Sequence, residues 1–309
     1  NPQTIAGIVG EIKAVAELVG IASPALAQTA GKPLTVVLIP ADGGTESGTI
    51  ADYQPVFNAV SRSTGIKFDL KVAQSYGAVV EAMCGGRADV AFMGPVTYLQ
   101  AQKRGCAKLL AVGVENGLSV YYAGFFARKD APFKSVKDLR GKRVAFGDVN
   151  SASSFVFPMA MVIEAGLDPV RDLGEIRMAG SHVNSLAALV QGRVDAAALS
   201  FDSYEKAVRQ GAVDPKKFRV IAKSSPIPYP PIAVNSRLAP KLQAKLRAAF
   251  ADIAHAPGMT PEMIRGYGGK RIDGYDVKFP AAKFNVAASR MALVNDDLKS
   301  RILTKSASR

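Results

Sequence analysis

The sequence has no tryptophan and only two histidines, His182 and His255, among its 309 residues. It also lacks the HExxH and paired-cysteine patterns of zinc sites, the GxxxxGK[ST] loop of nucleotide hydrolases and the GxSxG turn of serine hydrolases. Ser151, His182 and Asp202 are the residue types of a catalytic triad, but no motif surrounds them. We therefore expect a binding protein rather than an enzyme, with no metal and no cofactor.

Acidic residues are few relative to basic ones. The chain has 26 Asp and Glu against 39 Lys and Arg, a formal net charge of +13, which favours an anionic partner. The basic residues are scattered, as in residues 102–105 and 139–143. They form neither a long basic stripe nor the aromatic-interleaved pattern of a nucleic-acid groove. We expect a small anion and no nucleic acid.

Long apolar runs are also missing. Ala25-Leu26-Ala27 fits a signal-peptidase site before Gln28, but charged residues between positions 11 and 17 interrupt the apolar stretch before it. Residues 1–27 are thus predicted to be either a signal peptide or an amphipathic helix that packs on a partner chain or on the body. The pattern favours a periplasmic or secreted protein, either free or attached to a membrane.

Only two cysteines are present, Cys84 and Cys106. One lies at the end of a predicted helix and the other just beyond the next helix, so they could meet. In an oxidising compartment a bridge closing such a loop is worth about 3 kcal/mol. The alternative is a pair of small buried hydrophobic side chains. We favour the disulfide.

From Leu34 onward short apolar strands alternate with helical stretches, which is typical of an α/β fold. Residues 75–91 align without a gap on residues 181–197. In both copies a helix ends at glycine and an aspartate opens a buried strand. The repeat predicts two related lobes.

The chain is expected to cross between the lobes near residues 127 and 224. Four prolines between positions 226 and 231 predict an extended return rather than a helix or a central strand. The first lobe would then contain residues 31–126 and 225–309, and the second residues 127–224. Helices within 240–256, 261–267 and 280–303 are expected to pack on the first lobe. The N-terminal or C-terminal helices would be the contact of a homodimer.

In open α/β sheets, ligands bind beyond the carboxyl ends of the strands, where helix N-termini present free N–H groups. Ser151, Ser153 and Ser154 lie between a predicted strand and a helix expected to begin near Ser154. Their hydroxyls and amides could donate several hydrogen bonds to one tetrahedral oxyanion. Ordinary helix capping is the alternative. We predict an oxyanion site at this turn.

Tyr76 and His182 occupy equivalent positions in the two repeats, each at the start of a helix after a strand. We expect them to face each other across a cleft and to contact the ligand. Further candidates at strand ends or helix starts are Thr97, Tyr98, Tyr121, Tyr122 and Asp202. The tyrosines have a core alternative, and Asp202 a capping alternative. Asp202 would matter if it accepts a ligand proton or orients His182.

Residues 34–240 resemble the periplasmic phosphonate-, phosphite- and phosphate-binding components of ABC importers. The resemblance is carried, in order, by residues 73–101, 121–158, 179–205 and 221–234. It implies a type II periplasmic-binding fold with two hinge crossovers, a ligand cleft between the lobes and a membrane permease as partner. A related protein for another anion, such as a sulfonate or a thiamine precursor, and a phosphoester-processing enzyme are the alternatives.

The resemblance also assigns residues. It places the oxyanion at the serine turn, where Ala152 stands in place of a frequent threonine and offers only its backbone N–H. It maps further family contacts onto Tyr76, Tyr121, His182 and Asp202. Family members selective for aminoalkylphosphonates tend to have glutamate where this chain has His182. The histidine therefore favours a smaller ligand, such as phosphite, phosphate or methylphosphonate.

Overall fold

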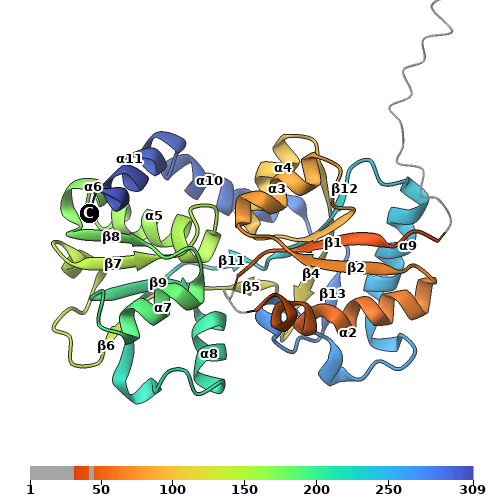
Figure 1. Cartoon of the computed structure of the whole chain (residues 1–309), viewed down its shortest axis with the longest axis horizontal. Helices are drawn as coiled ribbons and strands as arrows, with labels where there is room; N and C mark the ends of the chain where they lie inside the picture. Colours follow the sequence, from red (N-terminus) through yellow and green to blue (C-terminus); the bar gives the residue numbers. More distant parts are fainter. Residues whose placement is uncertain (1–30, 42–44, 309) are drawn as a thin grey trace, which may run out of the picture.

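The computed structural model describes residues 31–41 and 45–308, and its chain folds into two lobes (Figure 1). The first lobe is built on a six-stranded sheet in the order β13-β4-β12-β3-β1-β2, and the second on a five-stranded sheet in the order β10-β6-β9-β7-β8. The predicted α/β class and two-lobed arrangement are confirmed. The predicted signal peptide or N-terminal helix, residues 1–27, lies outside the described residues.

The strands of the first lobe are β1 (Leu34–Leu38), β2 (Phe68–Val72), β3 (Val90–Phe92), β4 (Ala107–Val114), β12 (Pro231–Asn235) and β13 (Gly274–Asp276). Its helices are α2 (Glu46–Thr64), α3 (Tyr76–Cys84), α4 (Pro95–Lys103) and α9 (Pro240–Ala251). The strands of the second lobe are β6 (Ala123–Arg128), β7 (Arg143–Phe146), β8 (Glu175–Met178), β9 (Ala196–Ser200) and β10 (Phe218–Lys223). Its helices are α5 (Phe157–Glu164), α6 (Pro169–Asp172), α7 (His182–Val190) and α8 (Phe201–Arg209).

The two lobes repeat one topology, as the sequence predicts. The order β12-β3-β1-β2 in the first sheet corresponds to β6-β9-β7-β8 in the second. Ser75 and Ser181 cap α3 and α7 with the same extended backbone and the same side-chain bond to the third residue of the helix. Asp89 and Asp195 each accept a backbone N–H of the neighbouring strand at 2.8 Å. The repeated residues therefore make equivalent hydrogen bonds in both lobes.

The lobes are joined by a short antiparallel ribbon of β5 (Val120–Tyr121) and β11 (Ile227–Pro228). Because β6 already belongs to the second sheet, the chain enters that sheet at Ala123, a few residues before the predicted boundary at 126. The proline-rich return is extended, but it leads into β12, a central strand between β3 and β4. Pro231 fits there because it is the first residue of the strand and its carbonyl accepts the N–H of Met93.

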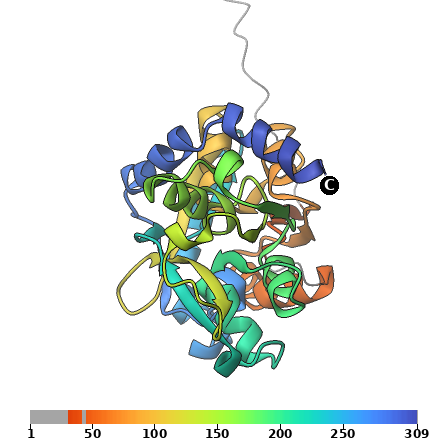
Figure 2. The same cartoon turned by 90° about the vertical axis from the view of Figure 1, so that its left-hand side faces the viewer.

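The C-terminal helices also correct the prediction. The stretch 280–303 is not one helix on the first lobe: α10 (Asn285–Leu293) contacts α4 and α5, and α11 (Asp296–Ala307) contacts β8 and α6 of the second lobe (Figures 1 and 2). Asn295 starts α11 by accepting the N–H of Leu298. Leu298 and Ile302 are buried. Apolar burial thus holds this helix on its own chain, where a homodimer contact was expected, and no finding supports that dimer.

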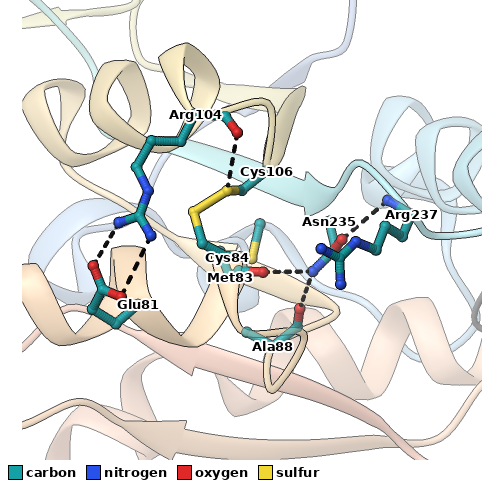
Figure 3. The surroundings of a disulfide bond; sticks show 8 residues. All are labelled: Glu81, Met83, Cys84, Ala88, Arg104, Cys106, Asn235 and Arg237. Atoms are coloured by element: carbon teal, nitrogen blue, oxygen red, sulfur yellow. Dashed lines mark hydrogen bonds and ion pairs between the residues drawn. A yellow bond between two sulfur atoms is a disulfide. The ribbon is translucent and has the colours of Figure 1, made fainter.

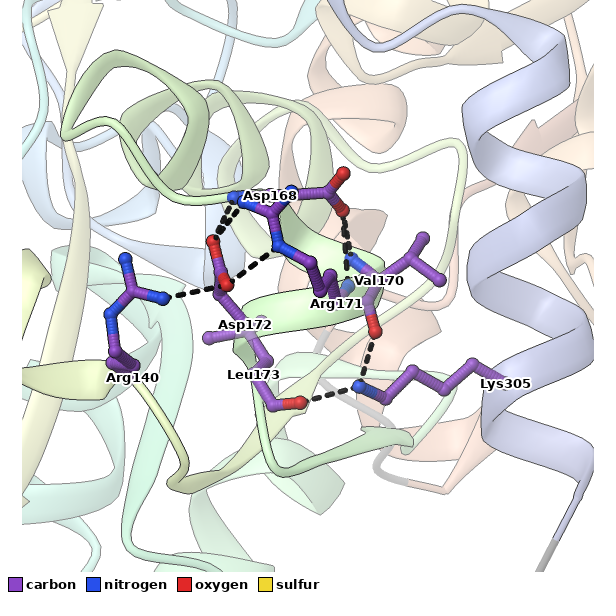
Figure 4. Close-up of polar contacts among 7 residues, drawn as sticks. All are labelled: Arg140, Asp168, Val170, Arg171, Asp172, Leu173 and Lys305. Carbon is purple, nitrogen blue, oxygen red and sulfur yellow. Dashed lines mark hydrogen bonds and ion pairs between the residues drawn. The ribbon is translucent and has the colours of Figure 1, made fainter.

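Asp172, at the end of α6 and shortly before β8, lies in the segment that α11 contacts (Figure 4). Its buried carboxylate accepts hydrogen bonds from Arg171 at 3.0 and 3.1 Å, from the Asp168 N–H at 2.8 Å and from Arg140 at 2.6 Å. Beside it, Lys305 of α11 donates to two carbonyls of the Val170–Leu173 segment. The Arg171 guanidinium, with the backbone N–H and Arg140, holds the pKa of Asp172 well below its usual range, against the opposing effect of burial.

We expect this carboxylate to make stability depend on pH. Because its pKa is lower in the folded than in the unfolded chain, its contribution is present above about pH 4 and is lost as the pH falls below that. Asp172→Asn should therefore unfold at lower urea concentration than the wild type at neutral pH, and the gap should shrink toward about pH 2. Asp130→Asn, at an 88% exposed side chain, is the control; a gap for Asp172→Asn that does not change with pH would contradict this role.

Cys84 and Cys106 form a disulfide with their Cα atoms 4.9 Å apart (Figure 3). The bond ties the end of α3 to the residue before β4, around α4. Nearby, Arg104 and Glu81 form an ion pair at 2.5 Å. Asn235 donates from its side chain to the carbonyl of Met83, in the last turn of α3, and to that of Ala88, after the helix, at 2.8 and 3.0 Å. This corner of the first lobe is therefore fixed both covalently and by buried hydrogen bonds.

Candidate functional site

The serine turn begins earlier than the sequence predicts. A π-helical turn, Ala152–Val156, leads directly into α5, and Ser151 is its cap, accepting the N–H of Ser154 at 3.1 Å. The capping alternative thus accounts for Ser151 and leaves Ser153 and Ser154 for other contacts. The backbone N–H groups of Ala152 and Ser153 lie in the first turn, where a helix supplies no acceptor of its own. All four residues are buried, at 1% exposure or less.

The hydroxyl of Ser154 is buried without a hydrogen-bond acceptor in the part of the chain that the structure describes. Its Oγ is buried and has no hydrogen-bond partner among the described residues. Leaving such a group unpaired costs about 1–3 kcal/mol, so its persistence points to a missing ligand atom. Gly147, at the end of β7, makes room for this side chain, because a Cβ there would lie 2.2 Å from the Ser154 Oγ. The turn is shaped around this hydroxyl.

The imidazole ring of His182 lies beside the serine turn, with Nε2 as the nearer ring nitrogen. Its Nδ1 accepts the Ser200 N–H at 3.1 Å, so in the neutral ring the proton is on Nε2. Nε2 lies 3.5 Å from the Ser151 Oγ and 3.2 Å from the Tyr267 hydroxyl. The ring is fully buried. The strand end of β9 therefore aims an N–H donor at the serine turn.

Tyr121 and Tyr267 close the cluster. The buried Tyr121 hydroxyl bonds to Ser153, and burial raises the pKa of the phenol. Tyr267 comes from the first lobe, in a stretch predicted as helix but found as short 3₁₀ turns and loop. Its ring centroid lies 5.3 Å from that of Tyr121 and its hydroxyl is 3.1 Å from the Ser200 Oγ. Sequence reasoning missed Tyr267, because only closure of the lobes brings it here; the glycine pair after it is the one local sign of a tight loop.

The lobes touch through a symmetrical pair of contacts at the helix starts. The Tyr76 N–H of α3 donates to Asp148 after β7 at 3.1 Å, and the His182 N–H of α7 donates to the Ala41 carbonyl after β1 at 3.3 Å. Gln100 also donates to Asn150 at 3.0 Å. Tyr76 is thus brought next to the serine-turn segment, and its expected contact with the ligand, facing His182, stays a prediction. The structure is that of a closed protein.

Asp202 does not orient His182, as the sequence suggested it could. Its buried carboxylate instead pairs with Lys270 of the first lobe at 3.0 Å, and Lys270 also pairs with Glu115 at 3.0 Å. Burial raises the pKa of Asp202, and the charge of Lys270 opposes that shift. The His182 ring is oriented by a backbone N–H instead. Asp202 therefore acts as an ion-pair partner across the lobes.

Three other candidates are engaged away from this cluster. Thr97 donates to a carbonyl of its own helix start at 3.0 Å. Tyr98 packs on Phe284 with ring centroids 5.0 Å apart, in the core of the first lobe. Tyr122 lies under the Lys223 ammonium, 3.9 Å from the ring centroid. For these residues the structure favours the packing and capping alternatives over ligand contact.

Within residues 31–41 and 45–308, no three His, Cys, Asp or Glu side chains gather in a group able to hold a metal ion. The helices of that same part of the chain include none with the length and apolar character needed to cross a membrane.

Comparison with known proteins gives consistent matches. Residues 44–275 match the family described as "ABC transporter, phosphonate, periplasmic substrate-binding protein". The "Phosphate-import protein PhnD" of Mycolicibacterium smegmatis is 31% identical over 245 residues, which cover 75% of this chain and 76% of the relative.

Solved structures share the fold at lower identity. A binding protein component of a phosphonate ABC transporter from Pseudomonas aeruginosa superimposes with a TM-score of 0.73 at 20% identity, covering 90% of each chain. PhnD1 of Prochlorococcus marinus in complex with methylphosphonate gives a TM-score of 0.72 at 15% identity, covering 85% of this chain and 98% of that one.

Proposed function

This chain belongs to the family of periplasmic substrate-binding proteins of phosphonate ABC transporters, and from that premise we propose that it binds a small phosphorus oxyanion between its lobes and delivers it to a membrane permease. The fold is accordingly type II, with two hinge crossovers, and the family is one of binding proteins rather than enzymes. One observation carries the choice of site: the unpaired, buried Ser154 hydroxyl at a helix start, beside Gly147.

The serine turn has the donors that a phosphorus oxyanion needs. Two hydroxyls, of Ser153 and Ser154, and two first-turn amides, of Ala152 and Ser153, belong to the positive end of the helix. The Nε2–H of His182 adds a donor from the side. Ala152 brings no hydroxyl, so its share is the amide alone. Neutral donors of this kind bind anions by hydrogen bonding without a charged partner.

A small ligand fits this cluster better than a long one. The Tyr267 ring and the His182 ring fill the side of the turn that faces the first lobe, with ring centroids 6.2 Å apart. A substituent that points toward Tyr267 would have to displace its hydroxyl from the hydrogen bonds to Ser200 and His182. We therefore favour phosphate, phosphite or methylphosphonate. The names of the relatives agree with this range, since one is a phosphate-import protein and another was solved with methylphosphonate.

The compartment follows from the same premise. A periplasmic substrate-binding protein works in an oxidising space, where the Cys84–Cys106 disulfide is stable. We place the chain there, either free or held at the membrane surface near its permease. The closed arrangement of the two lobes is the form that such a permease would recognise.

Calorimetry tests the proposal directly. Phosphate, phosphite, methylphosphonate, 2-aminoethylphosphonate, methanesulfonate and sulfate should be titrated separately into the protein. At least one phosphorus compound should bind with a Kd of about 1 μM or tighter, that is, about 8 kcal/mol. Heat from methanesulfonate or sulfate alone would favour a sulfur oxyanion instead, and no heat from any of the six would exclude the proposed ligand class.

Tyr267→Ala should change the preference among ligands. Removing the ring opens space beside His182, so the affinity for 2-aminoethylphosphonate relative to methylphosphonate should rise at least about 10-fold, or about 1.4 kcal/mol. Tyr267→Phe keeps the ring and should shift the ratio much less. Tyr98→Phe, at a core tyrosine of the same lobe, is the control. A folded Tyr267→Ala protein with an unchanged ratio would refute the size limit.

A further inference from the structure

A second concave site lies between the lobes, next to the ligand cluster but separate from it. The cavity has a volume of about 450 Å³. One wall is the outer face of α8, with Lys206 and Arg209; the other is the first-lobe loop, with Arg265, Lys270 and Arg271. None of the serines of the turn lines it.

Basic side chains outnumber acidic ones among the residues that line this cavity. Asp52 is the single carboxylate among its lining residues. Lys206 pairs with Asp52 at 2.8 Å, and Lys270 is already paired with Asp202 and Glu115. The described part of the chain supplies no ion pair to the three arginines that remain: Arg209, Arg265 and Arg271. Glu262 is near enough to interact electrostatically with two of them, but it is exposed and forms no ion pair there either.

These arginines come from opposite lobes. Arg209 belongs to α8, which packs on β9 of the second sheet, whereas the Arg265–Arg271 loop contacts α2 of the first lobe. Closing the lobes therefore brings guanidinium groups of the same charge to one cavity, which opposes closure. An anion with two charged ends, placed between them, would turn that repulsion into attraction on both sides.

We propose that this cavity binds a multivalent phosphate-type anion that bridges the lobes and stabilises the closed form. Guanidinium groups suit this chemistry, because their planar forks donate two parallel hydrogen bonds to phosphate oxygens. Since the complete site exists only when the lobes are closed, the bridging anion and the ligand of the serine turn strengthen each other's binding. The inference goes beyond the proposed transport function, because it assigns a second anion site with an effector role.

Inorganic pyrophosphate is the probe, at about 0.15 M salt to limit non-specific attraction. It should bind the Ser153→Ala/Ser154→Ala protein, whose serine turn is disabled, as measured by calorimetry. Adding Arg209→Gln and Arg271→Gln to that protein should weaken pyrophosphate binding at least about 10-fold. Arg87→Gln/Arg193→Gln is the matched control, because it removes the same charge at exposed positions that correspond in the two repeats. That control should change the affinity less than about 2-fold.

In the protein with an intact serine turn, pyrophosphate should tighten methylphosphonate binding, and the Arg209→Gln/Arg271→Gln protein should lose this effect. Competition between the two ligands, or an equal loss in the matched control, would overturn the proposal. So would binding of the arginines to vesicles of anionic phospholipid without any binding of pyrophosphate. Because the first measurement uses a disabled serine turn, its result does not depend on whether the transport ligand has been identified correctly.

Discussion

Replacing Ser153 and Ser154 together by alanine is expected to weaken binding of the phosphorus oxyanion by about 100-fold or more. Each hydroxyl is placed to donate to a charged oxygen, and a hydrogen bond to a charged group is worth about 1.5–3 kcal/mol. Two such bonds amount to about 3–6 kcal/mol, or roughly a 10²- to 10⁴-fold change in Kd. Calorimetry with the tightest ligand of the six-compound panel measures the effect.

The control separates binding from folding. Ser289→Ala/Ser300→Ala makes the same chemical change at exposed positions of α10 and α11 and should leave the affinity intact. Ser151→Ala removes a helix cap instead, so its main cost should be about 1 kcal/mol of stability. If the doubly substituted turn binds within about 3-fold of the wild type while its thermal unfolding is unchanged, the oxyanion is held elsewhere.

Removing the disulfide should lower the free energy of unfolding by about 3 kcal/mol. The bridge spans a sequence separation of 22 residues, and its loss gives the unfolded chain that much more conformational freedom. Urea unfolding of Cys84→Ser/Cys106→Ser measures the loss as a lower midpoint. Ligand affinity should be nearly unchanged, because the bond lies at the end of α3 opposite to Tyr76.

Chemical reduction provides an independent route to the same state. Wild-type protein unfolded in the presence of a thiol reductant should have the midpoint of the doubly substituted protein, and reductant should not change the latter. If the wild-type protein has the same unfolding midpoint with and without reductant, the bridge adds nothing to stability.

Much of the fold was within reach of the sequence because its signals are local. Ser75 and Ser181 cap helices through a hydroxyl and an N–H three residues away, and each glycine that follows ends a helix within the same short segment. The repeat between residues 75–91 and 181–197 needs only alignment of the chain with itself. The serine turn could be predicted for the same reason, since a strand, a serine cluster and an apolar helix follow one another directly in the sequence.

Local sequence patterns did not predict which lobe a helix or strand joins, because that depends on contacts between distant segments. The sequence predicts a helix within 280–303 that packs on the first lobe, but Leu298 and Ile302 of α11 are buried where this helix contacts the second lobe. The sequence predicts a crossover near residue 127, whereas the pairing of β6 with β9 and β10 puts residues 123–128 in the second sheet. An apolar face has the same pattern whichever lobe covers it.

The sequence by itself determined the two related lobes, the helix starts and the place of the serine turn, because each of these is fixed by neighbours within a few residues along the chain. Only the tertiary structure decided that Tyr267 joins His182 at the proposed site, that Asp202 pairs with Lys270 rather than with His182, and that arginines of both lobes meet beside them. These contacts join segments more than about 50 positions apart, and they form only when two separately folded surfaces close on each other, which no local pattern of residues encodes.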